Sequence, residues 1–302
     1  TLIDLRRLFE NYESHHEDGI CDLKLVEIGS YAMGTTTQYS DLDVLIVPFS
    51  NDDNHERIEE FEKRMSLKSE TGTIFRKNQL TPLTNRLTNS RLLHGNAEFV
   101  LHAKVPIIHG KTRSDVAFDI QIGSLQTLYS SNFVRVAFQL DPRLILVYHW
   151  LRTQAEECKL FGGQLGLFSS YHLYMLIIHF AQKNGILPVL MEGYGHHLSS
   201  ALHWREITED YGDDKSAISP LYTTDEPDIW APDLTKQLVE YYAKRDFTKI
   251  KIYLGNGRVV KRSTDQLLLI DPFHDKDLGV CAVNYGATHM NTLFDKLKNN
   301  LS

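Results

Sequence analysis

The sequence lacks any long hydrophobic run. No window contains about eighteen uninterrupted apolar residues, the length that a membrane-spanning helix requires. The richest stretch, residues 173–180, is short and contains His179. The chain begins at Thr1 without the charged, apolar and small-residue pattern of a signal peptide, although a piece of a longer protein would lack it too. We therefore expect no membrane partner.

Cysteine is scarce and irregularly placed. The three cysteines, Cys21, Cys158 and Cys281, are far apart and show neither a CxxC motif nor the Cys/His spacing of a zinc site. An odd number of separated cysteines is typical of reduced thiols in a protein core. This pattern fits a cytosolic or nuclear compartment, and we expect a cytoplasmic protein.

An excess of positive charge is also missing. The 302 residues include 32 Lys and Arg against 39 Asp and Glu, which gives a net charge of −7. Because Lys and Arg contacts to phosphates supply much of non-specific nucleic-acid affinity, this chain alone would hold a nucleic acid weakly. Basic residues do gather late in the sequence, and a solvated face explains them as well as a binding surface does: Lys244, Arg245, Lys249, Lys251, Arg258, Lys261 and Arg262.

What is present is the pattern of a packed α+β protein. Hydrophobic residues make up 42% of the chain, enough for one large or two modest domains. Extended patterns and a Gly/Ser/Thr turn fill the first part, and helical periodicity follows after about residue 125. Strands first and helices afterwards predict two lobes with a cleft between them.

Periodicity also assigns individual elements. Helices are expected at residues 2–17, 51–68, 143–157 and 169–182. Strands are expected at residues 23–28, 41–47, 99–108 and 115–122. Pro48 is expected to close the second strand. Residues 70–95 are polar and rich in Thr and Asn, and they predict a long loop.

The densest chemical signal lies at the second of these strands. Asp41 and Asp43 are two residues apart, so in a strand both carboxylates project from the same face. Two carboxylates about 4–5 Å apart repel by roughly 3–4 kcal/mol at an effective dielectric of about 20. Two divalent cations about 3.5–4 Å apart would compensate and would also serve an in-line displacement at phosphorus. Mg²⁺ prefers oxygen ligands of this kind, so we expect Mg²⁺, with Mn²⁺ as the alternative.

A Gly-Ser turn precedes this pair. Gly29 and Ser30 let backbone N–H groups and a hydroxyl approach a triphosphate, and a helix that begins there would add a favourable dipole. Gly-Ser alone is usually only a turn, and Asp-x-Asp alone is common on surface strands. Together, at this distance and between two strands, the two motifs are much more specific.

The order Gly29-Ser30, Gly34-Thr35 and Ser40-Asp41-Leu42-Asp43-Val44 resembles the DNA polymerase β-like nucleotidyltransferase superfamily. Within it, the chain is similar to the terminal uridylyltransferases and the cytoplasmic poly(A) polymerases. Further matching motifs follow in the family's order: Val105-Pro106-Ile107-Ile108, Phe118-Asp119-Ile120, Leu140-Asp141-Pro142-Arg143, His149-Trp150, Phe168-Ser169-Ser170-Tyr171, Asp271-Pro272-Phe273 and Leu278-Gly279.

The resemblance implies roles for residues in the first part of the chain. Asp41, Asp43 and Asp119 would bind the metal ions. Asp119 would also help to deprotonate the attacking 3′-hydroxyl of an RNA. Gly29 and Ser30 would contact the triphosphate of the incoming nucleotide.

In the second part, the resemblance implies a nucleotide-binding set. Arg152 would take a phosphate-binding position, Ser170 would bond a terminal phosphate, and Tyr171 would stack on the base. Asp271 would read the base edge directly or through water. Without the resemblance, Tyr171 would be taken for a core aromatic residue and Asp271, before a proline, for a turn residue.

Three positions depart from the family's pattern. Tyr148 stands where relatives usually carry Lys, so one phosphate contact is lost or supplied from elsewhere. Ser130 stands in the place of a ribose-binding Asn, with Asn132 close enough to be the alternative. The loop of residues 271–279 is one residue shorter than expected, and His274 would be the residue in it that excludes adenine.

The resemblance also implies a two-lobed nucleotidyltransferase with its active site in the cleft. A small mixed-sheet catalytic domain would occupy residues 20–125. A mainly helical poly(A) polymerase-associated domain would occupy residues 126–302, with helix 1–19 packing on it. The expected reaction adds UMP from UTP to RNA 3′ ends by a two-metal mechanism. A partner protein or a missing domain is expected to supply RNA affinity.

Three alternatives stay open. A cytoplasmic poly(A) polymerase would use the same scaffold with ATP. A small-molecule nucleotidyltransferase is disfavoured by the loop of residues 271–279. A catalytically inactive RNA-binding scaffold usually loses a metal-binding carboxylate, whereas all three are present in this sequence.

Overall fold

A computed structural model of the chain describes residues 22–49, 63–64, 70–100, 106–122, 126–162, 167–193, 230–263, 266–273, 278 and 286–301. The chain divides into two compact units, Thr1–Ser131 and Asn132–Ser302, within helix α5 (Gln126–Leu140). The helix expected over residues 2–17, and nearly all of the one expected over 51–68, lie outside the described residues. The domain limits of 20–125 and 126–302, and the packing of helix 1–19, stay predictions.

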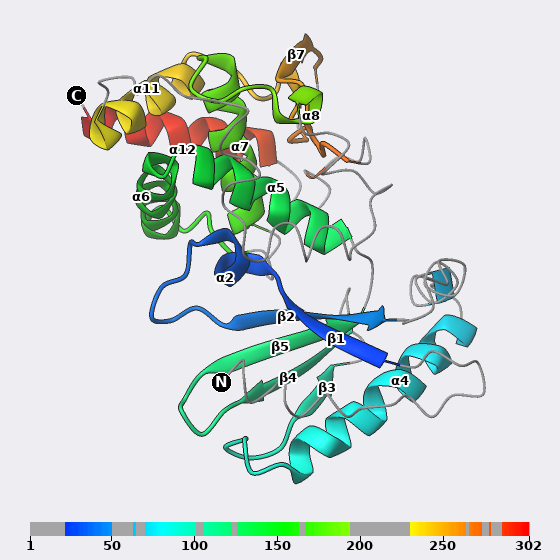
Figure 1. The fold of residues 1–302 in the computed structure, drawn as a ribbon. Coiled ribbons are helices and arrows are strands. Elements are labelled where there is room, and N and C mark those ends of the chain that lie inside the picture. Colours follow the sequence, from blue (N-terminus) through cyan, green and yellow to red (C-terminus); the bar gives the residue numbers. More distant parts are fainter. Residues whose placement is uncertain are drawn as a thin grey trace. The chain divides into compact units, whose positions relative to one another are not determined.

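Unit 1 is built on a five-stranded mixed sheet, drawn in blue to green in Figure 1. The strand order is β1-β2-β5-β4-β3; β2 and β5 are parallel, and the other neighbours are antiparallel. The strands are β1 (Asp22–Glu27), β2 (Leu42–Phe49), β3 (Glu98–Val100), β4 (Ile107–Lys111) and β5 (Ala117–Ile122). The mixed sheet confirms the prediction for the first lobe. The single strand predicted over 99–108 is two strands, β3 and β4.

The two faces of β2 differ in what they pack against: Leu45, on the same face as Asp43, is buried but lies outside the core cluster of the opposite face. Leu42, Val44 and Ile46 share one face and are at most 6% exposed. They belong to the hydrophobic core that lies between the sheet and helix α4 (Glu70–Asn89). Because side chains alternate along a strand, Asp43 projects from the opposite face. The apolar residues of β2 thus fix which way the carboxylate points.

Helix α4 replaces the long loop that we predicted for residues 70–95, so that prediction was wrong. Although the segment is rich in Thr and Asn, it carries a narrow apolar stripe along one face of the helix. Leu80, Leu83 and Leu87 recur at three- and four-residue spacing and are each 0% exposed. Burial of this stripe against the sheet outweighs the weak helix propensity of the polar residues and the presence of Pro82 inside the helix.

Strand β2 also continues past Pro48, which we expected to end it. Pro48 is paired with Leu23 of β1, and the strand ends at Phe49. The pairing of β2 with β5 covers residues 42–46 only, so in the described part of the chain β2 has a neighbour on one side at Pro48. The missing N–H of Pro48 therefore removes no hydrogen bond from the sheet if its nitrogen faces the side of β2 that has no neighbouring strand.

Unit 2 is mainly helical, as predicted. Its helices beyond α5 are α6 (Arg143–Glu157), α7 (Ser170–Lys183), α8 (Leu190–Gly193), α11 (Ala231–Ala243) and α12 (Gly286–Leu301). Helix α6 has the predicted limits, and α7 begins and ends one residue later than predicted. A small sheet of β6 (Ile250–Tyr253), β7 (Arg258–Lys261) and β8 (Leu269–Ile270), in the order β7-β6-β8, was not predicted.

Helix α7 is deeply buried in unit 2. Its residues 172–182 are all buried. The hydroxyl of Tyr242 in α11 donates a hydrogen bond of 2.8 Å to the carbonyl of Leu176, and the ring packs against Phe247 and Phe294. This packing holds α7 and therefore the residues at its N-terminus. None of the helices in the described part of the chain is long and apolar enough to cross a membrane.

Candidate active site

The carboxylates of unit 1 meet on neighbouring strands. Asp43 of β2 is directly opposite Asp119 of β5 in the parallel register, and Asp41 lies two residues before Asp43. Neighbouring strands are about 4.8 Å apart, so side chains in register on one face are close to each other. Asp43 and Asp119 are partly buried, whereas Asp41 is exposed. Residues that are 76 positions or more apart in sequence are thus brought onto one face of the sheet.

The surroundings of Asp43 disfavour its negative charge. Burial, the charge of Asp119 and the charge of Asp41, in that order, raise the pKa of Asp43 to about 7. No cationic group counteracts this rise in the pKa of Asp43. An added cation would stabilise the ionised form of the carboxylate. This is the electrostatic environment that a divalent metal ion would reverse.

Gly29 lies directly against Asp43. A Cβ atom on Gly29 would be 2.2 Å from Asp43 Oδ2. Gly29 also has a φ of +63°, a left-handed backbone conformation that residues with a side chain rarely adopt. The backbone N–H of Ile28 donates to the carbonyl of Asp43 at 3.1 Å. Glycine is therefore required where the short helix α2 (Gly29–Met33) begins beside the carboxylate.

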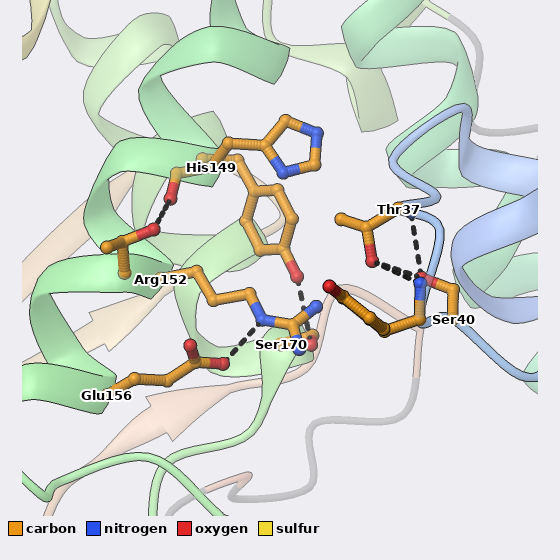
Figure 2. A network of polar contacts seen from close by, with 9 residues as sticks. Thr37, Ser40, His149, Arg152, Glu156 and Ser170 are labelled. Atoms are coloured by element: carbon orange, nitrogen blue, oxygen red, sulfur yellow. Dashed lines mark hydrogen bonds and ion pairs between the residues drawn. The ribbon is translucent and has the colours of Figure 1, made fainter.

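The expected phosphate contacts of the Gly-Ser turn are only partly available. The N–H of Gly29 donates to Ser131 Oγ at 3.1 Å, and the Ser131 hydroxyl in turn donates to the carbonyl of Thr127 at 2.8 Å. Ser131 is buried and links α2 to helix α5. This contact spans 102 residues and was not predicted from the sequence. Ser30 is half-buried. Just before Asp41, the Ser40 hydroxyl accepts a 2.9 Å hydrogen bond from the N–H of Thr37 (Figure 2).

Whether these carboxylates fit a metal ion depends on their chemistry and on their geometry. Within the described ranges, no group of three or more His, Cys, Asp or Glu side chains is gathered as a ready metal site. Asp119 Oδ1 lies 2.7 Å from Nδ1 of His109, its neighbour on β4. The oxygen donors fit Mg²⁺ or Mn²⁺ in type. His109 engages Oδ1 of Asp119 alone, so an ion held by all three carboxylates would use Asp119 Oδ2, or Oδ1 in place of His109.

In unit 2, the start of α7 is linked to the segment after β8. The Tyr171 hydroxyl donates to Asp271 Oδ2 at 3.2 Å, and Asp271 Oδ1 accepts the N–H of Phe273 at 2.8 Å. Asp271 is only 4% exposed. Two residues that the sequence singled out 100 positions apart are thus in direct contact.

His172 makes a second link, which the sequence did not single out. The N–H of Ser169 donates to His172 Nδ1 at 3.1 Å, so the ring closes a capping box at the start of α7. Since Nδ1 accepts, Nε2 carries the hydrogen and donates to the carbonyl of Leu278 at 3.1 Å. Burial lowers the pKa of His172, which keeps the ring neutral in this role.

Figure 2 shows the polar network between α6 and α7. The Tyr148 hydroxyl donates to Ser170 Oγ at 3.0 Å, and Arg152 interacts both with this hydroxyl and with Glu156, to which its Nε donates at 2.8 Å. Arg152, Ser170 and Tyr148 therefore form one group, as expected for Arg152 and Ser170. Tyr148, noted in the sequence only as a departure, is its central member.

The remaining predicted residues are separate from these groups. Ser130 is half-buried on α5, whereas Asn132, the alternative to it, is 4% exposed. His274 lies outside the described residues. The role of each predicted site residue stays a prediction.

The comparisons with known proteins agree with this arrangement. Residues 4–138 match the family described as poly(A) RNA polymerase, mitochondrial-like, central palm domain. No curated protein sequence matches the chain.

Solved structures of similar fold cover both units. A chain of the GLD-2/RNP-8 complex matches with a TM-score of 0.70 and 15% identity, over 98% of this chain and 83% of that one. The crystal structure of mtPAP in complex with UTP matches with a TM-score of 0.70 and 17% identity, over 98% of this chain and 61% of that one. A cytoplasmic RNA terminal U-transferase matches with a TM-score of 0.64 and 15% identity, over 99% and 85%. These likenesses establish the fold of two-lobed polymerases of this type.

Proposed function

Because residues 4–138 belong to the poly(A) RNA polymerase-like palm domains of the nucleotidyltransferases, we propose that this protein is an RNA 3′-terminal uridylyltransferase. It adds UMP from UTP to the 3′ ends of RNA. The main support is the register that sets Asp43 beside Asp119, with Asp41 two residues away. Three carboxylates that repel one another on one sheet face suit a reaction in which cations neutralise phosphates.

Asp41, Asp43 and Asp119 are the residues that would hold divalent metal ions, Mg²⁺ or Mn²⁺. Ions bound there supply positive charge at the phosphoryl group that is transferred. Asp119 accepts the proton of the RNA 3′-hydroxyl at a carboxylate oxygen. The 3′-oxygen forms a bond to the α-phosphorus of UTP, the bond from that phosphorus to the bridging oxygen breaks, and pyrophosphate leaves.

The residues of unit 2 hold the nucleotide. Arg152 and the Ser170 hydroxyl bind phosphate, and the N-terminus of α7 adds a favourable dipole for an anion. Tyr171 stacks on the base. Asp271 accepts from Tyr171 and from Phe273, but an ionised carboxylate has further lone pairs and can accept from uracil N3–H directly or through water. Adenine has no donor at the corresponding position, so the wrong base leaves a buried acceptor unpaired.

A cytoplasmic poly(A) polymerase that uses ATP is the second candidate. The family model that residues 4–138 match is described as a poly(A) RNA polymerase, whereas a cytoplasmic RNA terminal U-transferase is among the structures of similar fold. The preference for UTP rests on the edge of the base and on His274 as the residue that excludes adenine. Ser130, or Asn132 in its place, contacts the ribose in either case.

RNA affinity is expected to come largely from outside this chain. The net charge of −7 leaves few phosphate contacts, so a partner protein or a further domain would deliver the RNA. The structure of the GLD-2/RNP-8 complex is an example of a similar fold in complex with a second molecule. We propose a cytoplasmic location.

The decisive experiment is extension of a short labelled RNA with each of the four nucleoside triphosphates offered separately, with Mg²⁺ and with Mn²⁺. We expect extension with UTP and weaker extension with ATP. Equal use of the two would refute the uridylyl assignment and favour the poly(A) polymerase. Absence of extension with every nucleotide and metal, by a folded protein supplied with high RNA concentrations, would favour an inactive scaffold.

A further inference from the structure

Tyr148 is a buried tyrosine whose hydroxyl is placed between two phosphate-binding candidates. It lies on α6, is 0% exposed, and its ring packs on Tyr174 with a centroid distance of 4.3 Å. A buried phenol hydroxyl needs hydrogen-bond partners. Here the hydrogen-bond partner is Ser170, at the start of α7. Arg152, one helical turn further along α6, interacts electrostatically with the same hydroxyl.

The hydrogen bonds of this hydroxyl run in one direction. The Tyr148 hydroxyl donates to Ser170 Oγ at 3.0 Å. The positive guanidinium of Arg152 interacts electrostatically with the same hydroxyl oxygen and favours this direction, because a guanidinium has no acceptor atom. Because Ser170 Oγ is already an acceptor, the Ser170 hydrogen points to another group. Among the described residues, Ser170 has no other hydrogen-bond partner for its side chain.

We propose that Tyr148 is a positioning residue that makes the Ser170 hydroxyl a donor to the terminal phosphate of the nucleotide. This inference rests on the proposed function, because it takes the start of α7 as the phosphate end of the nucleotide site. The order Tyr148, Ser170, phosphate is a chain in which each member donates to the next, with the charge of Arg152 beside its first member. Such chains polarise their members, so the last donor is stronger than an isolated serine.

The arrangement also explains how the positive charge of Arg152 can act on a phosphate bound at the N-terminus of α7. Arg152 Nε is held by Glu156, and its guanidinium lies over the ring of Phe161 at 5.2 Å, so its position is fixed without a ligand. Tyr148 brings no charge. It extends the influence of Arg152 to Ser170 through its hydroxyl, and a phosphate oxygen at Ser170 gains a second donor of fixed direction.

The test is Tyr148→Phe, which keeps the ring and its packing on Tyr174 and removes only the hydroxyl. We expect the affinity for UTP, measured by calorimetry with Mg²⁺, to fall about tenfold, the size of one hydrogen bond to a charged group. The affinity for UMP should stay unchanged, because UMP lacks the terminal phosphates. A purely structural tyrosine would change both equally or neither.

A mutant cycle and a matched control complete the experiment. In a Ser170→Ala background, Tyr148→Phe should cost nothing further, because the group that it positions is gone. Tyr174→Phe removes the hydroxyl of the adjoining buried ring and should leave the ratio of UTP to UMP affinity unchanged. Thermal unfolding of each variant checks that α6 and α7 stay packed.

The two possible failures are distinguishable. If the wild type binds no nucleoside triphosphate, the proposed function fails. If the wild type binds UTP and Tyr148→Phe binds it equally well, or if the loss persists undiminished in the Ser170→Ala background, the role of Tyr148 is overturned while the function stands.

Discussion

The carboxylate face of unit 1 and the start of α7 in unit 2 are opposite kinds of polar site. In unit 1, Asp43 has acidic neighbours, and its pKa is raised to about 7. In unit 2, Tyr171 is paired with Asp271, and Tyr148 with Ser170. The first site is incomplete without an external cation, whereas the second is organised in advance of its ligand. Each polar group needs a partner. Unit 2 supplies partners for both tyrosines and for Asp271, whereas in unit 1 Asp119 is paired with His109 and the pKa of Asp43 is raised by burial and by its acidic neighbours.

The largest effect is expected from substitutions of the carboxylates of unit 1. Asp43→Asn and Asp119→Asn should each lower RNA extension by roughly 10³-fold or more, because charge stabilisation of the transferred phosphoryl group is lost. The fold should persist, since neither carboxylate belongs to the hydrophobic core. The measurement is initial extension rate at saturating UTP and Mg²⁺.

A matched acidic residue serves as the control for this experiment. Asp115 is exposed in the turn between β4 and β5, where it pairs with Lys111, and Asn tolerates its φ of 67°. Asp115→Asn should retain nearly full activity. Retention of more than a small fraction of activity by Asp43→Asn would contradict the assignment of metal-binding carboxylates.

A second prediction sharpens the contrast through pH. The pKa of Asp43 is raised in the folded state from 3.8 to about 7, so the protonated form stabilises the fold fully below about pH 3.8. That stabilisation is lost as the pH rises to about 7. The wild type should therefore lose up to about 4 kcal/mol relative to Asp43→Asn across this window, measured by urea unfolding without divalent metal.

Added metal ions should reverse this difference. Mg²⁺ at pH 8 should raise the melting temperature of the wild type and leave that of Asp43→Asn nearly unchanged. If the two proteins show parallel stability from pH 4 to pH 8, the like-charge account of unit 1 is wrong.

The sequence predicts features that depend on neighbouring residues better than it predicts contacts between distant ones. Asp41 and Asp43 are recognised because a strand places them on one face, and the limits of α6 follow from its own periodicity. Asp119, Tyr171 and Asp271 were singled out only through the resemblance. The pairings of Asp43 with Asp119 and of Tyr171 with Asp271 were not predicted, because contacts between distant residues leave no mark in periodicity.

Other features could not be read from the sequence for identifiable reasons. We predicted a loop in place of helix α4 because, among its described side chains, the fully buried apolar ones are three leucines in an otherwise polar segment. The hydrogen bond from Gly29 to Ser131 joins residues 102 positions apart, and either residue alone suggests only a turn or a helix. His109 and His172 act through partners that the fold supplies, and a lone histidine has no sequence signal for that.

A third prediction concerns the glycine beside Asp43. Gly29→Ala would put a Cβ atom 2.2 Å from Asp43 Oδ2 at a φ of +63°. Gly34→Ala has similar backbone strain at +72° but meets nothing within 4 Å. Gly34→Ala should cost about 1–2 kcal/mol in the free energy of unfolding, and Gly29→Ala more. Gly29→Ala should also lower extension activity, because Asp43 must move. Equal effects of the two substitutions would show that the contact with Asp43 is unimportant.

The smallest expected effect tests how unit 2 keeps its ligand site organised. His172→Gln retains a capping-box acceptor for the N–H of Ser169, because Gln is a natural third residue of this motif. It should lose the hydrogen bond to the Leu278 carbonyl, which costs about 1 kcal/mol. His172→Ala loses both contacts and should be less stable still, by the value of the cap, about 1 kcal/mol. In the Gln variant the KM for UTP should rise a few-fold, on the order of one weakened hydrogen bond, with kcat nearly unchanged. The free energy of unfolding and the two kinetic constants would be measured for both variants. An unchanged KM in His172→Ala would mean that the Leu278 link does not organise the nucleotide site, and the contrast between the two units would then rest on Tyr148 and Tyr171 alone.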